Sequence, residues 1–403
     1  MFNLWGSEGV SKDEEKIEEL LTRGVSAIFP NADFLRGELQ SGKRLRLYLG
    51  IDPTAPSLHI GHVGPLLKLR QFQDLGHEVI LLIGDFTGMI GDPTDKTATR
   101  KKLTREEVVT NASLYQEQAG TIVRWSGKNA ARLEYNSHWL SKLTFEEVLE
   151  LSSYMTVEQL LKRDMFEKRM ADGKPIYLHE FLYPLMQGYD SVAMEVDGEL
   201  GGNDQTFNML AGRTLEKQIK NKEKFVLAMK LLEGGGGKKM GKTEGNAVFL
   251  SDSPEEMFGK VMSWEDGLIV PALELITTAP LEEIKNIEAS LASGSNPKDA
   301  KAHLAKEIVA LFHGKERAEE ATSNFGNVPA DAVEVTVTPG TLFAEALMKT
   351  NLVSSKSELR RLLESGAIED AVSGEVIRLM DHPLTKDQTV KIGKHRFLKI
   401  IVS

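Results

Sequence analysis

The chain has 403 residues, of which 41% are hydrophobic and 27% charged, the composition of a globular protein with two or three domains. It contains no cysteine, which excludes disulfides and cysteine-ligated zinc or iron–sulfur sites. The formal net charge of -10 argues weakly against a nucleic-acid partner for the chain as a whole.

The N-terminal segment, MFNLWGSEGVSKDEEKIEEL, has no basic region followed by an apolar stretch, so no secretory signal is visible. No stretch approaches the roughly 18 apolar residues that would span a bilayer. We therefore expect a cytoplasmic protein without a membrane partner. Ser11 and Glu14 predict a capping box, followed by an amphipathic helix with Ile17, Leu20 and Leu21 on its apolar face.

A parallel β–α–β unit is predicted next. Residues 45–51 (LRLYLGI) form a buried strand that runs into a turn and a helix, which Gly76 ends. Residues 79–84 (VILLIG) form a second apolar strand, followed by the loop DFTGMIGDPTDKTATRKK. Helices must cover both faces of such a sheet, and ligands collect at the carboxyl ends of its strands. Both loops are therefore expected at a ligand-binding edge.

The middle of the chain contains a helical insertion and a glycine-rich loop. Residues 144–180 are polar and mostly helical in pattern, and the helix continues over 181–190. Residues 233–246 (EGGGGKKMGKTEGN) hold six glycines, which predicts a mobile loop.

Further helices are predicted after this loop. One begins at Ser253-Pro254-Glu255-Glu256, and another begins at Asn296-Pro297 and ends at Gly314. Residues 324–340 contain two prolines and are interpreted as a linker.

The C-terminal segment combines a helix with short alternating strands. The helix, SKSELRRLLESG, is capped by Ser355 and Glu358 and stopped by Gly366. From Gly340 to Ser403 there are ten Lys and Arg against eight Asp and Glu, a local charge of +2 where the remainder carries -12. This asymmetry indicates either a module with an anionic partner or merely a neutral small domain.

Two histidines mark the strongest local motif, PSLHIGH. His59 and His62 share one face at a helix start, and Gly61 between them allows a flat ligand to approach the backbone. The helix N-terminus suits phosphate. On their own, two such histidines are also common as ordinary surface or core residues.

Two further groups of polar residues point to a ligand site. Lys238, Lys239 and Lys242 on the glycine-rich loop could close over a polyphosphate, although such a loop alone is often a solvated linker. A phenol, an amide and an acid also lie at i, i+4 and i+7 of one helix, where the alternative is an exposed polar face: Tyr183, Gln187 and Asp190.

Taken together, these motifs resemble the class I aminoacyl-tRNA synthetases, and within them the bacterial-type tyrosyl branch. His59-Ile60-Gly61-His62 matches the first signature of the class. Lys239-Met240-Gly241-Lys242-Thr243 is similar to the second, Lys-Met-Ser-Lys-Ser, with mild departures at Gly241 and Thr243. The segments YLGIDPTAPSLHIGH, GMIGDPTDKTATR, YPLMQGYD and GGNDQ resemble the tyrosyl branch, and the resemblance covers the whole chain.

The resemblance implies an α/β fold: a Rossmann-like parallel-sheet catalytic domain with a helical insertion, an all-α anticodon-binding domain and a small α+β RNA-binding domain similar to one of a ribosomal protein. The implied boundaries are 1–232 for the catalytic domain with its insertion at about 144–180, 233–250 for the mobile lysine loop, 251–325 for the helical domain and 340–403 for the RNA-binding domain.

The activity implied is a tyrosine–tRNA ligase. L-tyrosine would react with ATP to give tyrosyl-adenylate and pyrophosphate, and tyrosine would pass to the 3′-terminal adenosine of tRNA(Tyr). Mg²⁺ would accompany the nucleotide, with no metal ligand from the protein, and the chain would be a homodimer joined through residues 144–180.

The resemblance also assigns roles to residues, and we group them by ligand. The substrate phenol would bind Tyr48 and Asp190, its ammonium group Asp92, Tyr183 and Gln187, and its carboxylate Gln205. The residues implied for the nucleotide are Gly50, Asp52, Gly61, Gly202, Asp204 and Met240. The residues implied for the chemistry at the phosphates and pyrophosphate are Thr54, His59, His62, Lys96, Arg100, Lys239 and Lys242. The residues implied for RNA are Lys356, Arg360 and Arg361. Leu49 departs from the family pattern, because many relatives carry there a cysteine that contacts the ribose.

Three other functions compete with this one. Tryptophan activation on the same fold is disfavoured by Tyr48 with Asp190 and by the C-terminal module. A different adenylyl or nucleotidyl transferase would leave the helical domain and that module unexplained. An RNA-binding protein built on an inactive synthetase is disfavoured by the intact histidines and lysines of both signatures.

Overall fold

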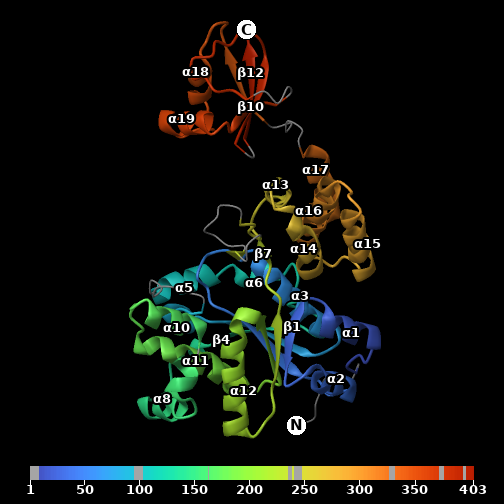
Figure 1. Ribbon diagram of the computed structural model, residues 1–403, viewed down its shortest axis with the longest axis vertical. Coiled ribbons are helices and arrows are strands. Elements are labelled where there is room, and N and C mark those ends of the chain that lie inside the picture. Colours follow the sequence, from blue (N-terminus) through green and yellow to red (C-terminus); the bar gives the residue numbers. More distant parts are fainter. Residues whose placement is uncertain are drawn as a thin grey trace. The chain divides into compact units, whose positions relative to one another are not determined.

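In the computed structural model, the chain forms two compact units (Figure 1). The residues it describes are 9–94, 103–161, 163–234, 238–239, 247–325, 332–371, 376–393 and 396–403. The first unit runs to Ser251 and also includes Glu265–Ser295, and the second contains Asp252–Trp264 and Asn296–Ser403. Residues 265–295, which we assigned with the helical domain, thus belong to the first unit.

A six-stranded sheet forms the centre of the first unit, in the order β1-β6-β5-β2-β3-β4. Its strands are β1 (Val25–Phe29), β2 (Arg46–Ile51), β3 (Glu78–Ile83), β4 (Arg132–Tyr135), β5 (Gly198–Gly202) and β6 (Phe225–Met229). Five strands run parallel, and β1 pairs antiparallel with β6 at one edge. The structure confirms the predicted parallel unit, whereas the antiparallel edge strand was not predicted.

Helices cover both faces of this sheet. α3 (Val63–Asp74) joins β2 to β3, and α12 (Thr206–Lys220) joins β5 to β6. These two connections run in opposite directions along the sheet, so right-handed crossovers place α3 and α12 on opposite faces. The other helices outside the insertion are α1 (Glu14–Thr22), α2 (Ala32–Ser41), α4 (Thr87–Ile90), α5 (Arg105–Ala112), α6 (Tyr115–Ala119), α7 (Ser137–Leu140), α11 (Leu178–Met194), α14 (Ile269–Ile276) and α15 (Leu281–Ala292).

The predicted helical insertion lies between β4 and β5. It contains α8 (Phe145–Ser152), α9 (Val157–Leu161) and α10 (Asp164–Ala171), and α11 follows it. α8 begins with a capping box in which Thr144 accepts a hydrogen bond from the backbone of Glu147.

The cap predicted for the first helix is wrong by two residues. α1 begins at Glu14, and the side chain of Asp13 caps it by accepting a 3.2 Å hydrogen bond from the backbone N of Lys16. Ser11 lies too far ahead and accepts instead from the backbone N of Asp13. An aspartate directly before the first helical residue is the better cap. The predicted apolar face is confirmed, because its residues Ile17, Leu20 and Leu21 are buried.

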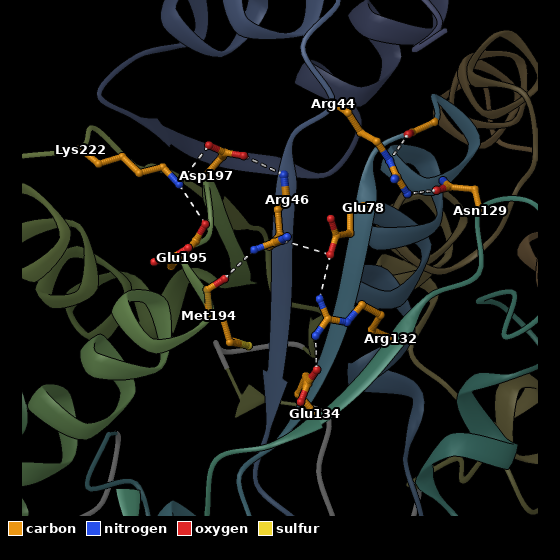
Figure 2. A network of polar contacts seen from close by, with 11 residues as sticks. Arg44, Arg46, Glu78, Asn129, Arg132, Glu134, Met194, Glu195, Asp197 and Lys222 are labelled. Carbon is orange, nitrogen blue, oxygen red and sulfur yellow. Dashed lines mark hydrogen bonds and ion pairs between the residues drawn. The ribbon is translucent and has the colours of Figure 1, made fainter. Parts of the chain in front are cut away.

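A network of ion pairs joins the amino ends of the strands, at the opposite end of the sheet from the predicted ligand site (Figure 2). Oε1 of Glu78 on β3 accepts from Arg46 on β2 and from Arg132 on β4, each at 3.0 Å. Asp197, just before β5, accepts a 2.8 Å hydrogen bond from the backbone N of Arg46. Although burial acts to raise it, the pKa of Asp197 is lowered by hydrogen bonds, chiefly from Lys43. The network ties four neighbouring strands together.

The second unit begins with three packed helices, α13 (Pro254–Met262), α16 (Pro297–His313) and α17 (Lys315–Asn324). Their predicted starts are confirmed: Ser253 caps α13, and Asn296 caps α16 by accepting from the backbone N of Lys298. In the residues that the structure describes, no helix is both long and apolar enough to cross a membrane.

A small sheet completes the second unit, in the order β10-β11-β12-β9. Its elements are β9 (Val333–Val337), α18 (Phe343–Met348), α19 (Lys356–Glu364), β10 (Ile368–Asp370), β11 (Gln388–Ile392) and β12 (Arg396–Val402). The linker predicted for 324–340 is wrong in part, because β9 lies within it and pairs parallel with β12. Its sequence VEVTV alternates polar and β-branched residues, a strand pattern that the flanking prolines obscured.

Candidate active site

A cavity of about 630 Å³ lies at the carboxyl ends of β2, β3 and β5 in the first unit. Residues of these strands, of the loops that follow them and of α11 line it, and Leu275 and Ile276 at the end of α14 form part of its wall. This is the sheet edge at which the parallel unit predicted a ligand.

Most of the predicted site residues meet in this cavity. Those that line it are Tyr48, Gly50, Asp52, Thr54, His59, Gly61, His62, Asp92, Tyr183, Gln187, Asp190, Gly202, Asp204 and Gln205. Lys96, Arg100, Met240 and Lys242 lie outside the described residues. Lys239 is described only in its backbone, as part of β8 (Lys238–Lys239), which pairs antiparallel with β7 (Glu233–Gly234). The RNA candidates Lys356, Arg360 and Arg361 belong to α19 of the second unit, where all are exposed.

A buried carboxyl group marks one end of the cavity. Asp190 on α11 is 2% exposed, and each of its oxygens accepts a hydrogen bond. Trp139 Nε1 donates to Oδ1 at 2.8 Å, and Asn136 Nδ2 donates to Oδ2 at 3.2 Å. Burial raises the pKa of Asp190 well above its usual value, while these two hydrogen bonds act in the opposite direction.

The fully buried hydroxyl of Tyr48 lies at the same end. It donates a 3.4 Å hydrogen bond to the backbone O of Gln187 and lies 3.3 Å from Oγ of Ser191. Burial raises the pKa of Tyr48 well above 10, and the charges of Glu199 and Asp190 add to the effect. The phenol therefore stays protonated at neutral pH and remains a hydrogen-bond donor.

A second carboxylate, Asp92, stands in the loop after β3. Its Oδ1 accepts from the backbone N and the hydroxyl of Thr94, at 2.9 and 2.6 Å. Its Oδ2 accepts from Nε2 of Gln205 at 2.7 Å. These bonds hold a negatively charged group at the cavity wall in one orientation.

A third carboxylate, Asp52, follows β2 and joins two predicted groups of residues. Its Oδ2 accepts a 2.8 Å hydrogen bond from the hydroxyl of Tyr183, and its Oδ1 accepts one of 2.7 Å from Thr87. Burial, followed by the charge of Asp52, raises the pKa of Tyr183 well above 10. Gly84 is required beside this carboxylate, because an added Cβ would lie 2.0 Å from Oδ1 of Asp52.

The two histidines form the start of α3. His59 precedes a 3₁₀ turn, Ile60–His62, and its Nδ1 accepts a 3.1 Å hydrogen bond from the backbone N of Gly61. Nδ1 of His62 accepts from the backbone N of His59, also at 3.1 Å, and the ring centroids are 4.1 Å apart. A neutral His59 ring whose Nδ1 accepts carries its proton on Nε2, the donor form suited to phosphate oxygens. Nδ1 of His62 also lies 3.2 Å from the backbone O of His59, and its role as donor or acceptor depends on the tautomer.

Two glycines at the end of β5 allow a close approach to the cavity floor. An added Cβ at Gly202 would lie 2.4 Å from Oδ1 of Asp204, and one at Gly201 would lie 2.9 Å from Sδ of Met209. The carboxylate of Asp204 therefore lies against a backbone that has no side chain in its way.

Motif reasoning missed several residues that hold the cavity's side chains. They are Thr87, Thr94, Asn136, Trp139, Ser191, Glu199 and Lys224. The sequence contained one indication of such a residue: Glu199 is a charged residue inside the short strand that leads into GGNDQ. The contacts of Asn136 and Trp139 come from a segment that carries no recognisable motif.

Comparisons with known proteins agree with this geometry. The family model described as "tRNA synthetases class I (W and Y)" matches residues 40–328. A tyrosine–tRNA ligase of Carboxydothermus hydrogenoformans is 46% identical over 404 residues, which cover 95% of this chain and 97% of that protein. A tyrosine–tRNA ligase of Moorella thermoacetica is 45% identical, with 94% of each chain covered.

A solved structure is similar as well. The C-terminally truncated mitochondrial tyrosyl-tRNA synthetase of Aspergillus nidulans superposes with a TM-score of 0.66 at 25% identity. The match covers 77% of this chain and 93% of that one.

Proposed function

Because this chain belongs to the class I tRNA synthetases for tryptophan and tyrosine, we propose that the cavity at the sheet edge is where its amino acid and ATP react. The chain is an aminoacyl-tRNA ligase that activates L-tyrosine with ATP and transfers it to tRNA(Tyr). The observation that carries the site assignment is the buried pair Tyr48 and Asp190, a hydroxyl and a carboxyl group at one end of the cavity.

Substrate tyrosine would lie with its phenol at this pair. Tyr48 would donate to the phenol oxygen in place of the backbone O of Gln187, and Asp190 would accept a hydrogen bond from the phenol hydroxyl. Phenylalanine in the same position would form neither hydrogen bond, although it would still exclude water from both groups, which costs free energy. The binding of tyrosine is thereby favoured over that of a residue of almost the same shape.

The other end of the substrate would meet the carboxylate and amide groups. Its ammonium lies against Asp92, with Tyr183 and Gln187 nearby, and its carboxylate lies near Gln205. Asp92 and Gln205 already share a hydrogen bond, which brings the groups for the ammonium and the carboxylate together.

ATP would occupy the histidine side of the cavity. Asp204 binds the ribose beside Gly202, while Thr54, His59 and His62 contact the phosphates. Lys96, Arg100, Lys239 and Lys242 would bind the departing pyrophosphate, and Gly50, Asp52, Gly61 and Met240 would contact the nucleotide.

The chemistry needs no general base, because the tyrosine carboxylate is ionised at neutral pH. It attacks the α-phosphorus in line, and the bond to pyrophosphate breaks. The protein contributes position and positive charge. A ribose hydroxyl of the terminal adenosine then attacks the tyrosyl carbonyl, and AMP leaves.

Mg²⁺ would enter with the nucleotide. Among the described residues no cluster of three or more His, Asp or Glu side chains could hold a metal ion, so the phosphate oxygens would be its principal ligands. When bound, it neutralises charge on the pyrophosphate.

The second unit would bind tRNA. We propose that residues 251–325, of which 265–295 belong to the first unit, read the anticodon arm and that residues 340–403 grip structured RNA. The exposed cations on α19 support this, because the same helix buries Leu359 and Leu363 and so presents Lys356, Arg360 and Arg361 outward. We propose that the chain acts in the cytoplasm.

A homodimer would form through the insertion at 144–180. Its support is a set of large apolar side chains that the single chain leaves exposed there. They are Phe145 at 78%, Leu149 at 56%, Val157 at 61% and Leu178 at 77% exposure. Light scattering checks this proposal: the wild type should have twice the mass of one chain, and Phe145→Glu with Leu178→Glu should halve it.

Amino-acid-dependent ATP–pyrophosphate exchange tests the activity itself, run with tyrosine, phenylalanine and tryptophan in parallel. Exchange with tyrosine alone is expected. Exchange with tryptophan instead would move the assignment to the other branch of the family. No exchange from a folded preparation that binds tRNA would favour an inactive synthetase.

A further inference from the structure

A buried ion pair lies beside the phenol end of the cavity. The side chains of Lys224 and Glu199 are 0% and 2% exposed, and Nζ of Lys224 donates to Oε2 of Glu199. Glu199 is part of β5 and Lys224 directly precedes β6, the neighbouring strand. Removing two charges from water costs about as much as their attraction returns, so stability alone does not account for the pair.

The fold makes room for this ammonium group with two glycines. Gly188 on α11 and Gly212 on α12 face each other where these helices pack, because a Cβ at Gly188 would lie 3.1 Å from the backbone N of Gly212. A Cβ at Gly212 would lie 2.6 Å from Nζ of Lys224 and 2.8 Å from Oγ of Ser191. Any larger residue at 212 would displace the ammonium from Ser191.

Each member of the pair holds a different group of the tyrosine site. Oε1 of Glu199 accepts a 3.0 Å hydrogen bond from Nε2 of Gln187. Nζ of Lys224 donates a 2.6 Å hydrogen bond to Oγ of Ser191, and that oxygen lies 3.3 Å from the hydroxyl of Tyr48. One ion pair therefore reaches both ends of the substrate site.

The ammonium group and a backbone carbonyl together determine the direction of these hydrogen bonds. An ammonium group can only donate, so Oγ of Ser191 accepts from Lys224. The hydroxyl of Tyr48 donates to the backbone O of Gln187 at 3.4 Å, so Ser191 directs its own proton to the oxygen of Tyr48. On the carboxylate side, Glu199 can only accept, so Gln187 turns its NH₂ toward Glu199 and its carbonyl oxygen away from it.

We propose that Lys224 and Glu199 are positioning residues that set specificity for a phenol, by orienting Ser191, Tyr48 and Gln187. The proposal rests on the assignment of this cavity to tyrosine. A chain of donors runs from Lys224 through Ser191 to Tyr48, and a bound phenol would take the Tyr48 proton in place of the backbone O of Gln187. The phenol proton of the substrate would point to Asp190. The two oxygens of Asp190 also accept hydrogen bonds from Asn136 and Trp139.

Two variants test the donor chain without leaving a lone buried charge. Ser191→Ala keeps the ion pair and removes the link to Tyr48. The double variant Lys224→Met with Glu199→Gln removes the ammonium but keeps an acceptor for Gln187. Lys222→Met is the control, because Lys222 forms a partly exposed 3.1 Å ion pair with Asp197 at the opposite end of the sheet, away from the cavity.

The readout is kcat/KM in pyrophosphate exchange for tyrosine and for phenylalanine, with KM for ATP and urea unfolding measured on the same samples. In both test variants the tyrosine-to-phenylalanine ratio should fall about tenfold, the effect of one misdirected hydrogen bond. KM for tyrosine should rise while KM for ATP stays within about twofold, and Lys222→Met should leave the ratio unchanged.

An unchanged ratio in Ser191→Ala, with tyrosine exchange intact in the wild type, would overturn the proposal and leave the pair a purely structural one. Equal losses for tyrosine and ATP would also overturn it, because general loosening affects both. Absence of tyrosine exchange in the wild type would instead refute the assignment of the cavity.

Discussion

Nε2 of Gln205 donates a 2.7 Å hydrogen bond to Oδ2 of Asp92, across 113 positions of sequence. The two side chains come from the loops that follow β5 and β3, so the parallel sheet brings them to one cavity wall. Thr94 holds the other oxygen of the same carboxylate. Asp92 thus keeps one orientation and presents its charge where the substrate ammonium is proposed to bind.

Asp92→Asn should weaken tyrosine binding. A hydrogen bond to a charged group contributes about 1.5–3 kcal/mol, so KM for tyrosine should rise about 10- to 100-fold. KM for ATP should change little. Asp74→Asn, which alters a surface carboxylate paired with Arg70 and Arg124, is the control. Equal effects on both substrates would argue against an ammonium site at Asp92.

Tyr48→Phe should lower discrimination between tyrosine and phenylalanine by about tenfold, because the substrate phenol loses one buried donor. Parallel exchange assays with the two amino acids measure the ratio. Tyr115→Phe is the control, since Tyr115 is also buried but donates its hydroxyl to the backbone O of Ala55. A ratio that stays constant in Tyr48→Phe would show that the phenol binds elsewhere.

His62→Asn should reduce kcat for exchange by about 10²- to 10³-fold, because a donor aimed at the phosphates acts mainly in the transition state. Tyrosine affinity, measured by calorimetry without ATP, should stay at the wild-type value. His138→Asn, which changes a histidine outside the cavity lining, should leave kcat unaltered. Loss of tyrosine affinity in His62→Asn would mean that the helix start had been disrupted instead.

Arg360→Gln combined with Arg361→Gln should weaken tRNA binding and leave pyrophosphate exchange intact. Removing two phosphate contacts should also reduce the slope of log affinity against log salt concentration by about two. Filter binding over a range of salt concentrations measures both quantities. Arg36→Gln on α2 of the first unit, a surface arginine paired with Glu18, is the control. An unaltered slope would show that these arginines of α19 do not contact the RNA.

His77 should make the first unit less stable in acid. It is fully buried, its Nδ1 accepts a 3.2 Å hydrogen bond from the backbone N of Leu45, and burial followed by the charge of Arg44 lowers its pKa to about 4. The unfolded chain takes up this proton near pH 6.5, so stability is complete above that pH and falls as pH drops toward 4.

The expected loss from this histidine is about 3 kcal/mol between pH 6.5 and 4. Urea unfolding at several pH values measures it. In His77→Asn the amide oxygen can still accept from Leu45 but does not titrate, so this variant should show a flatter pH profile. An identical slope in both proteins would assign the acid sensitivity to other groups.

Local signals predicted most of the secondary structure. The strands at 45–51 and 79–84, the helix starts at Ser253 and Asn296 and the cap at Ser355 all appear, because each depends on residues within a few positions of one another. The errors were also local. Asp13 displaced Ser11 as a cap, and prolines hid a strand whose partner, β12, lies some sixty residues further along the chain.

The sequence by itself determined which segments meet. Parallel strands that end in polar loops bring those loops to one end of the sheet, so the order of strands and loops along the chain is enough to expect His59 and Asp92 in one cavity. Tyr183 lies on a helix, and only the family resemblance joined it to them. Family resemblance added the identity of the ligands to this arrangement.

Only the tertiary structure decided how each side chain is held. Asp190 is held by Asn136 and Trp139, and Tyr48 is linked through Ser191 to Lys224. A hydrogen bond requires atoms to approach within about 3 Å, and distant elements reach that distance only when helices and sheet pack. One such case is the close packing of α11 on α12, which two glycines permit. The sequence pattern of neither helix predicts the buried ammonium group of Lys224 beside them.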